Sequence, residues 1–490
     1  MSLPAPRPLW LPSEGPGNLN VPPEKWAMTV SQWAAFITTC TLTDRWDELA
    51  ASTDRKEAGY VNLYQVCNEY VKPWTRGTGN SIALLLNAGS PRQADLMISH
   101  AWGECIQETL VSVLARCSAL GASLDTAIWF CTFAQYQPGD EPGDCGPTVG
   151  EQLALDPFKQ VIASKPSGGM LVVHTSRAEL YGRLWCVFEV NVAQSHNVCA
   201  NAAMSMHYLG RTATRVEAQG QETLRVDTAN AECWSKDDAE MIKEKVRQGG
   251  GFGPLNAEIF NFRSAALLAS MNTFMAFKEW TETYKADSVA NGETLNFLSN
   301  AVRAAGRFVG LHCLLGPVEA AGDEETCSRI IGEARDLALY FSGDGFSVPP
   351  GAPPPPMFHP ERVGMIPTDL DDESVLCLLR GPEEGFGAKG SASMGCMMVG
   401  LLEMGAGGTA DMKEGGVELD PLTHVKMAFR LWDKDGSGTI AEGELCEVLK
   451  QLNPSFTDEE LQAMFEAADA NRDGLVDFSE FVDWISASAS

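Results

Sequence analysis

The sequence is short of basic residues for its length. Its 490 residues include 36 Lys or Arg against 65 Asp or Glu, a formal net charge of -29. Nucleic acids and anionic membrane surfaces are also negatively charged, so a chain of this charge binds them poorly. The acid is concentrated near the end, where residues 366–490 hold 25 Asp or Glu against 8 Lys or Arg. Nucleic acid is therefore not an expected partner.

Long apolar runs and paired cysteines are also missing. No stretch approaches the roughly 20 apolar residues that a membrane-spanning helix needs, and the N-terminus lacks the apolar core of a signal peptide. The 14 cysteines are scattered without a CxxC pair, which argues against a zinc site or a disulfide framework. We therefore expect a cytoplasmic protein without a membrane span.

Composition and periodicity divide the chain into five segments. These are an N-terminal arm with helices (1–93), an α/β domain (94–200), a mixed and then helical region (201–345), a Pro/Gly-rich linker (346–415) and an all-α end (416–490). Helices are predicted at 30–40 and 61–70 in the first segment, and at 257–284, 293–315 and 324–341 in the third. GFGAKG, residues 385–390, fits GxGxxG but has no clear βαβ unit before it, so we interpret it as a chance match.

Within 94–200, apolar runs of strand length alternate with helical patterns. The predicted strands are 94–99, 127–133 and 168–174, and the predicted helices are 105–120, 149–163 and 181–194. Such alternation predicts a flavodoxin-like parallel sheet covered by helices on both faces. Functional side chains of such sheets gather where the strands end.

Two twelve-residue stretches near the C-terminus have the pattern of EF-hand calcium loops: DKDGSGTIAEGE at 433–444 and DANRDGLVDFSE at 469–480. Calcium prefers six to eight oxygen ligands, and each loop supplies them at the required spacing, with Gly438 or Gly474 at the sharp turn. The predicted ligands are Asp433, Asp435, Ser437, the Thr439 carbonyl and Glu444 in the first loop. Those of the second loop are Asp469, Asn471, Asp473, the Leu475 carbonyl, Asp477 (through water) and Glu480.

The residues around the loops support the same interpretation. Ile440 and Val476, at the eighth position of each loop, are expected to form a short two-stranded contact. Thr457 and Glu460 form a capping box at the start of the next helix. Whether the pair is a sensor, with an apolar groove that calcium opens, or a module packed permanently against the rest of the chain stays open.

The stretch HTSRAELYGRLWCVFE, residues 174–189, resembles the Toll/interleukin receptor (TIR) domain family. In that family a strand and a short loop lead into a helix with a Trp-Cys pair before a Glu, here Trp185, Cys186 and Glu189. ISHAWGE, after the first strand, is similar to the opening strand and loop of these domains. Together with VNLYQVCNEYVKP and GGGFGPLNAEI, these motifs make the front half similar to uncharacterised TIR-like proteins of algae and protists.

The resemblance implies either of two activities. Some TIR domains cleave NAD, and the catalytic Glu of those domains maps onto Glu189. Others act by self-association or by binding protein partners. The long acidic loop after the second strand, QPGDEPGDCGP, is a poor place for a dinucleotide phosphate and argues against NAD. His100 and His174, both at strand ends, are either structural or, with Glu104, ligands of a metal ion.

Three functions therefore remain open. The first is a calcium-responsive signalling or interaction protein with a TIR-like domain, and the second is a calcium-regulated NAD glycohydrolase that uses Glu189. The third is a passive calcium-binding protein. For a sensor, the stretch 257–284 is a candidate target of the calcium-opened groove, unless it is a buried core helix.

Overall fold

The structure is a computed structural model of the whole chain. It describes residues 4–14, 20–52, 59–120, 122–137, 145–233, 235–284, 294–342, 371–380, 439–446, 457–477 and 480–481. Among the helices of these residues, none has the length and apolar character needed to cross a membrane.

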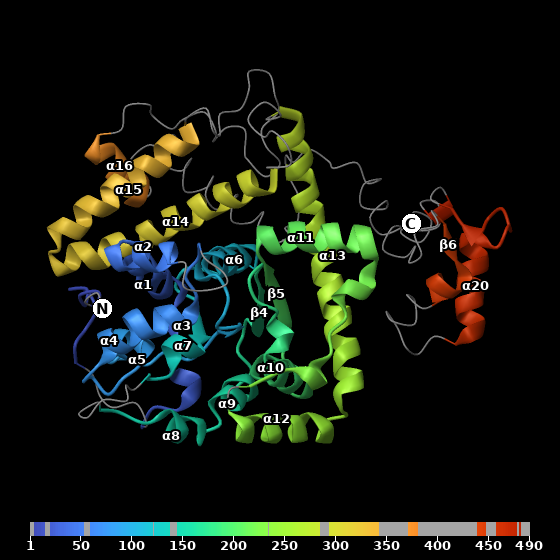
Figure 1. Cartoon of the computed structure of the whole chain (residues 1–490), viewed down its shortest axis with the longest axis horizontal. Helices are drawn as coiled ribbons and strands as arrows, with labels where there is room; N and C mark the ends of the chain where they lie inside the picture. Colours follow the sequence, from blue (N-terminus) through green and yellow to red (C-terminus); the bar gives the residue numbers. More distant parts are fainter. Residues whose placement is uncertain are drawn as a thin grey trace.

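One five-stranded sheet lies at the centre of the front part of the chain, in the order β1-β3-β2-β4-β5 (Figure 1). Its strands are β1 (Met28–Thr29), β2 (Leu96–Ser99), β3 (Ala127–Phe130), β4 (Met170–His174) and β5 (Ala200–Met204). Strands β2 to β5 pair in parallel, as the sequence predicts, whereas β1 pairs antiparallel with β3. The sheet is therefore mixed, with a short antiparallel edge that the sequence analysis missed.

Helices form the rest of the front part. Those before β4 are α1 (Val30–Thr41), α2 (Asp44–Ala51), α3 (Leu63–Val66), α4 (Lys72–Thr75), α5 (Ile82–Leu86), α6 (Ile106–Ala119), α7 (Cys131–Ala134), α8 (Val149–Leu153) and α9 (Pro157–Ala163). Those after β4 are α10 (Leu184–Ser195), α11 (Met206–Gln219), α12 (Lys236–Gln248), α13 (Phe252–Tyr284), α14 (Thr294–Ala321), α15 (Glu324–Ser342) and α16 (Asp372–Arg380). Short 3-10 or π turns are η2 (Pro23–Lys25), η3 (Cys67–Val71), η4 (Leu180–Gly182), η5 (Gln221–Leu224) and η6 (Thr228–Asn230).

Both faces of the sheet are buried. Because successive side chains of a strand point to opposite faces, Ile128 and Phe130 of β3 join one apolar cluster and Trp129 joins another. The first cluster contains residues of α1, α6 and α14, and the second contains residues of α9, α10 and α12. This two-sided burial explains why the strands read as continuous apolar runs.

Three predicted elements differ from the structure. The strand expected at 127–133 ends at Phe130, where the chain turns into α7. The helix expected at 149–163 is divided into α8 and α9, because Pro157 has no amide hydrogen to donate and Asp156 before it is left-handed (φ 48°). In place of the helix expected at 61–70, the structure has α3 followed directly by the π-helical turn η3, and α4 continues from it.

The α/β domain predicted at 94–200 ends too early, because the next residues of the region predicted as mixed contribute the fourth parallel strand. Strand β5, ANAAM, has few large apolar side chains and begins half-exposed, which explains why an apolar run does not reveal it. It pairs with β4 along its whole length, from Ala200 opposite Met170 to Met204 opposite His174.

The long helix α14 joins the helical region to the front of the chain. It packs against α1 and α6, and two glycines allow close approach of the backbones. A Cβ added at Gly306 would lie 2.6 Å from Val111 Cγ2, and one added at Gly310 would overlap Thr38 Oγ1. Side chains from 1–93, from 94–200 and from α14 share one hydrophobic cluster.

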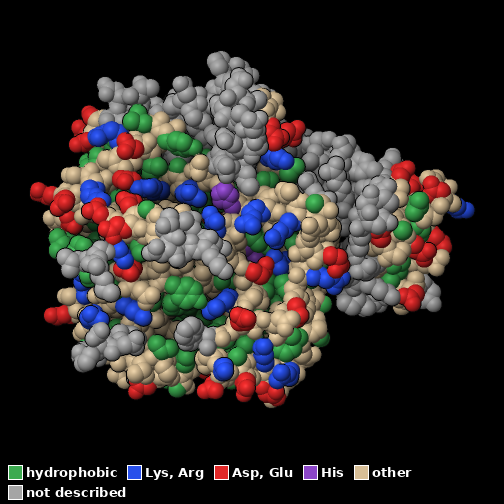
Figure 2. All heavy atoms as spheres, viewed as in Figure 1, with side chains coloured by type: hydrophobic (Ala, Val, Ile, Leu, Met, Phe, Trp, Pro, Cys, Tyr) green, Lys and Arg blue, Asp and Glu red, His purple; other side chains and the backbone are tan. Residues whose placement is uncertain are grey.

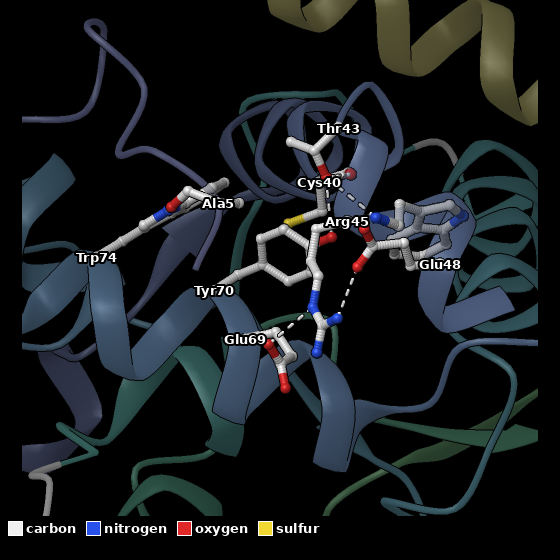
Figure 3. A network of polar contacts seen from close by, with 9 residues as sticks. Ala5, Cys40, Thr43, Arg45, Glu48, Glu69, Tyr70 and Trp74 are labelled. Carbon is white, nitrogen blue, oxygen red and sulfur yellow. Dashed lines mark hydrogen bonds and ion pairs between the residues drawn. The ribbon is translucent and has the colours of Figure 1, made fainter. Parts of the chain in front are cut away.

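Polar contacts tie the N-terminal arm and its helices together (Figure 3). The indole nitrogen of Trp74 donates to the Ala5 carbonyl at 3.0 Å, and the Tyr70 and Thr43 hydroxyl groups are 2.9 Å apart. Arg45 pairs with Glu69 at 3.0 Å. The arm is thus held by hydrogen bonds to residues distant in sequence.

Helix α13 contains the stretch 257–284 that we considered as a groove target. Among its described side chains, Ile259, Leu267, Met271 and Phe274 are buried in the two clusters. A buried helix is no free target, so that hypothesis is wrong and the core-helix alternative is confirmed. The GxGxxG match lies outside the described residues. Of the predicted linker at 346–415, residues 371–380 are described, and they contain the whole of α16. Val375 and Leu379 of this helix are buried in the first cluster, so this stretch is not an exposed linker.

Candidate functional sites: the calcium loops and the sheet edge

The second calcium loop has the conformation that its sequence requires. Gly474, at the sixth position, has φ 86°, a value that glycine adopts without strain. Its amide donates to Asp469 Oδ2 at 2.9 Å, and the Asp473 amide donates to Asp469 Oδ1 at 3.2 Å. The Asp473 amide also donates to Asn471 Oδ1 at 2.8 Å. These contacts draw the loop around the first three predicted ligands.

Glu480 closes this loop. One carboxylate oxygen accepts from the Asn471 amide at 2.8 Å and the other from the Asp477 amide at 3.0 Å. Asp477 Oδ1 in turn accepts from the Glu480 amide at 2.9 Å. Asp469 and Glu480 are 6% and 9% exposed, so both carboxylates lie inside the loop. The same Glu thus contacts the third and the ninth positions.

The first loop repeats one of these contacts. Glu444 Oε2 accepts from the amide of Ala441, the ninth residue of that loop, at 2.8 Å. This is the counterpart of the bond between Glu480 and the Asp477 amide in the second loop. Of the predicted ligands in the first loop, Thr439 and Glu444 are described, whereas Asp433, Asp435 and Ser437 lie outside the described residues.

The two loops pair as predicted. Strand β6 (Ile440–Ala441) runs antiparallel to β7 (Leu475–Val476), with Ile440 opposite Val476. Helix α20 (Asp458–Ala468) begins at the expected capping box of Thr457 and Glu460. The apolar side chains form a separate cluster, made of Ile440, Leu445, Leu461, Phe465, Ala468, Val476 and Phe481. In Figure 1 this part lies apart from the sheet.

Comparisons with known proteins agree with this geometry. The family described as EF-hand domain pair matches residues 422–486. Cell division control protein 31 of Schizosaccharomyces pombe is 44% identical over 71 residues, 14% of this chain and 40% of that protein. Troponin C isoform 1 of Drosophila melanogaster is 42% identical over 62 residues, 13% of this chain and 40% of that protein.

A putative calmodulin-like protein 6 of Oryza sativa subsp. japonica is 42% identical over 62 residues, 13% of this chain and 36% of that protein. The chain therefore spans about 40% of the length of the first two relatives. No solved structure gives a significant match.

The donor set of the loops fits calcium. Carboxylate, amide and carbonyl oxygens are the ligands of this hard cation, and the loop provides them around a glycine turn. The chain therefore contains an EF-hand domain pair, and the ion that this pair binds is calcium. Among the described residues, no three His, Cys, Asp or Glu side chains already converge on a common metal position. In the second loop the acidic side chains instead accept hydrogen bonds from its own amides.

The sheet edge presents a different environment around Glu189. This residue lies on α10 and is 5% exposed, and its Oε2 accepts from the Ser99 hydroxyl at 2.5 Å. Burial raises the pKa of Glu189 to about 8, against the weaker lowering effect of the Ser99 hydrogen bond. The carboxyl therefore holds its proton at neutral pH.

The whole Trp-Cys-x-x-Glu motif connects α10 to its neighbours. Trp185 stacks on Phe158 of α9 with ring centroids 4.9 Å apart. Cys186 Sγ contacts the His100 carbonyl oxygen at 3.2 Å, just beyond the end of β2. Together with the bond from Ser99 to Glu189, these contacts fasten α10 to the end of β2. The motif thus has a packing role in this chain.

The two histidines at strand ends are hydrogen-bonded core residues, as one of the two hypotheses expects. His100 contacts the Ile98 carbonyl oxygen at 3.3 Å and Cys131 Sγ at 3.4 Å. His174 contacts Val172 and Tyr181, each at 3.2 Å. Burial lowers the pKa of His100 to about 4 and that of His174 to about 3, so both are neutral.

Glu104 does not join the two histidines. It is fully buried and accepts from the Ala101 amide at 3.1 Å and the Thr109 hydroxyl at 3.2 Å. Burial raises its pKa well above the usual value. Each of the three side chains has hydrogen-bond partners of its own, so the structure favours the structural alternative for His100, His174 and Glu104 over a metal site.

Sequence reasoning missed Glu108, on the first turn of α6. This carboxylate is 8% exposed and accepts from the Ser176 amide at 2.9 Å, the Ser176 hydroxyl at 2.7 Å and the Ser205 hydroxyl at 2.7 Å. Its donors lie 68 and 97 residues away in the sequence. The only signal in the sequence is that Ser176 and Ser205 each follow a strand closely.

Proposed function

We propose that the protein is a calcium-responsive signalling protein, in which the EF-hand pair is the sensor and a TIR-like α/β domain binds protein partners or a second copy. The observation that carries this proposal is that the pair buries its apolar side chains in a cluster of its own. We also propose that the calcium ligands are those given above. The proposed domain organisation consists of five segments: 1–93, 94–200, 201–345, 346–415 and 416–490.

A closed apolar cluster is what a sensor needs before calcium arrives. In sensor EF-hands, calcium moves the helices apart and exposes an apolar groove to which a partner binds. Here Leu445, Phe465 and Phe481 are nearly fully buried within the pair, and none of them belongs to the clusters around the sheet. Of the two alternatives, the described residues therefore favour a sensor whose groove can open, rather than a module packed permanently against the rest of the chain.

Two features support a TIR-like domain. The parallel strands follow the spatial order β3-β2-β4-β5, which is the flavodoxin-like order of successive strands, 2-1-3-4. The Trp-Cys-x-x-Glu motif lies on the helix that follows the third of these strands. Because its Glu and Cys are used for packing, an interaction role for the domain agrees with the geometry better than a catalytic one.

The test is calcium-dependent exposure of apolar surface, measured with the full chain and a dye that fluoresces on apolar surfaces. We expect the signal to rise with calcium and to fall when a chelator is added. Glu480→Gln should reduce the response, whereas Glu466→Gln, a matched loss of charge on the exposed side of α20, should keep it. A dye signal independent of calcium would instead support a passive calcium-binding protein.

The alternative of an NAD glycohydrolase rests on the place of Glu189 beneath the end of β2. It requires this side chain to become a charged carboxylate that faces the ligand, which means breaking the bond from Ser99. The test is incubation with NAD, with and without calcium, followed by product analysis. Turnover that Glu189→Gln abolishes and Glu282→Gln preserves would establish the enzyme, and absence of turnover in the natural protein would exclude it.

A further inference from the structure

A cavity of about 230 Å³ opens at the carboxyl edge of the sheet, between α6, α11 and α14. Residues from segments far apart in the sequence line it, chiefly Glu108, Ser176, Arg177, His207, Arg211 and Arg303. Figure 2 shows Lys and Arg side chains grouped around a histidine in the region where these helices meet in Figure 1. This place is where parallel α/β sheets commonly bind ligands.

The three arginines of the cavity have no carboxylate partner within 4.0 Å among the described residues. One nitrogen of Arg211 donates to the Ser176 carbonyl at 2.8 Å, and the Arg177 guanidinium lies 5.0 Å from the centre of the Tyr60 ring. With 65 acidic residues against 36 basic ones, carboxylates are plentiful in this chain. Three arginines without an ion pair, gathered around one cavity, therefore need another explanation.

Glu108 does not neutralise them. Its oxygens accept three hydrogen bonds from Ser176 and Ser205, and it makes no ion pair with an arginine of the cavity within the described residues. Its contacts hold the loop after β4 to the start of α11, which begins after its N-cap Ser205. Glu108 thus shapes the cavity, and its single formal charge leaves an excess of two positive charges from the arginines.

Helix orientation adds to the positive potential. The first turns of α6 and α11 both line the cavity, with Gln107 on one helix and His207 on the other. The N-terminal end of a helix carries a partial positive charge and amide groups without intrahelical partners. Burial lowers the pKa of His207, and the three arginines lower it further against the opposing effect of Glu108. His207 is therefore neutral at pH 7 and can either donate or accept a hydrogen bond.

We infer that this cavity binds a small ligand through a phosphate group, with Arg177, Arg211 and Arg303 as its cationic partners. Planar guanidinium groups match phosphate oxygens with two parallel hydrogen bonds, and the two excess charges match a phosphate dianion. The ligand is either a free phosphate ion or a phosphate monoester, since both carry the phosphate group that the arginines would recognise. This site is distinct from both the calcium loops and Glu189.

The test is isothermal titration calorimetry of the full, calcium-free chain at constant ionic strength, with inorganic phosphate, adenosine monophosphate and acetate as probes. We expect saturable binding of at least one phosphate probe and none of acetate. Arg211→Gln and Arg303→Gln should each weaken it about tenfold or more, as expected for loss of a charge-assisted contact. Arg215→Gln, one turn further along α11 and exposed, is the matched control and should change affinity less than twofold.

Absence of saturable binding of both phosphate probes, or equal affinities of Arg211→Gln and Arg215→Gln, overturns the inference. Because Arg211 is exposed, its replacement leaves the fold intact, and circular dichroism of each variant checks this. Stronger binding of inorganic phosphate assigns the site to the free ion, and stronger binding of the nucleotide assigns it to a monoester. Unchanged phosphate affinity in Glu189→Gln and Glu480→Gln supports a site independent of the proposed functions, whereas loss in either contradicts it.

Discussion

The EF-hand pair and the sheet edge each bury a glutamate, but they hold it in opposite ways. Glu480 accepts from backbone amides three and nine residues away in the sequence. Glu189, on helix α10, accepts from a hydroxyl 90 residues away, at the end of strand β2. The first carboxylate is held inside a short loop beside other oxygen-bearing side chains, whereas the second is enclosed by the core of a domain.

This difference determines what each carboxylate can do. A loop that gathers several oxygens around one point gains stability when a cation arrives, because the ion offsets the repulsion between the acids. A carboxyl group enclosed by apolar neighbours with one hydroxyl donor loses its charge instead, as the pKa of about 8 for Glu189 shows. Three predictions test this contrast and a fourth tests the packing of α14 on α1, from the largest expected effect to the smallest.

The largest effect should come from calcium removal. If both sites bind in the sensor range, near 10⁻⁶ M, then 1 mM calcium stabilises the pair by about 4 kcal/mol per site. Scanning calorimetry of the full chain, with and without chelator, should show a large shift of the EF-hand transition and little change in the transition of the body. Titration calorimetry should count two calcium ions per chain. Fewer than two bound calcium ions per chain, or an equal shift of both transitions, would contradict the contrast between the two regions.

The second effect is a pH dependence from Glu189. Its pKa rises from 4.5 to about 8 on folding, so between these pH values the folded chain binds more protons than the unfolded chain. The free energy of unfolding should therefore decrease as pH rises, by at most about 3 kcal/mol between pH 4.5 and 7. Urea unfolding across this range measures it. Glu189→Gln should remove this part of the slope, and the exposed Glu282→Gln should not; identical slopes for both variants would contradict the assignment.

The third effect concerns individual calcium ligands. Glu480→Gln should weaken calcium binding by at least the roughly 10–100-fold that loss of a partner to a metal ligand costs, because it removes a charged and predicted bidentate ligand. Ser437→Ala should weaken it less, since water can replace a neutral hydroxyl oxygen. Titration calorimetry compares the two variants, with Glu466→Gln as the control for charge. Equal affinities of Glu480→Gln and Ser437→Ala would show that the loop uses its ligands differently.

The smallest effect should come from the contact between α14 and α1. Gly310→Ala would place a methyl group against Thr38 Oγ1, and overpacking of this kind costs about 1–3 kcal/mol. A Cβ added at Gly332 on α15 would meet no neighbouring atom within 4 Å, so Gly332→Ala should stabilise the helix by up to about 1 kcal/mol. Chemical denaturation measures both changes. If Gly310→Ala were as stable as Gly332→Ala, the close packing of the helical region on the front part would be wrong.

Several elements of the fold follow from the sequence alone because their causes are local. The capping box of Thr457 and Glu460, the turn at Gly474 and the pairing of Ile440 with Val476 each depend on residues a few positions apart or on a fixed loop spacing. Strands β2 and β4 are apolar runs, and α6 has an apolar face, so periodicity reveals them. The calcium ion is predicted on the same basis, since a twelve-residue loop contains all its ligands.

Other features were decided only when distant segments came together. Strand β5 has too few large apolar side chains to be recognised, and its place depends on the edge of β4. The burial of α13 and the hydrogen bonds of His100, His174 and Glu189 depend on neighbours from other elements. The cluster of Arg177, Arg211 and Arg303 arises from three elements that only the fold brings to one cavity. Spacing along the chain determined the calcium loops, whereas the environment of each residue at the sheet edge was set by packing between residues far apart in the sequence.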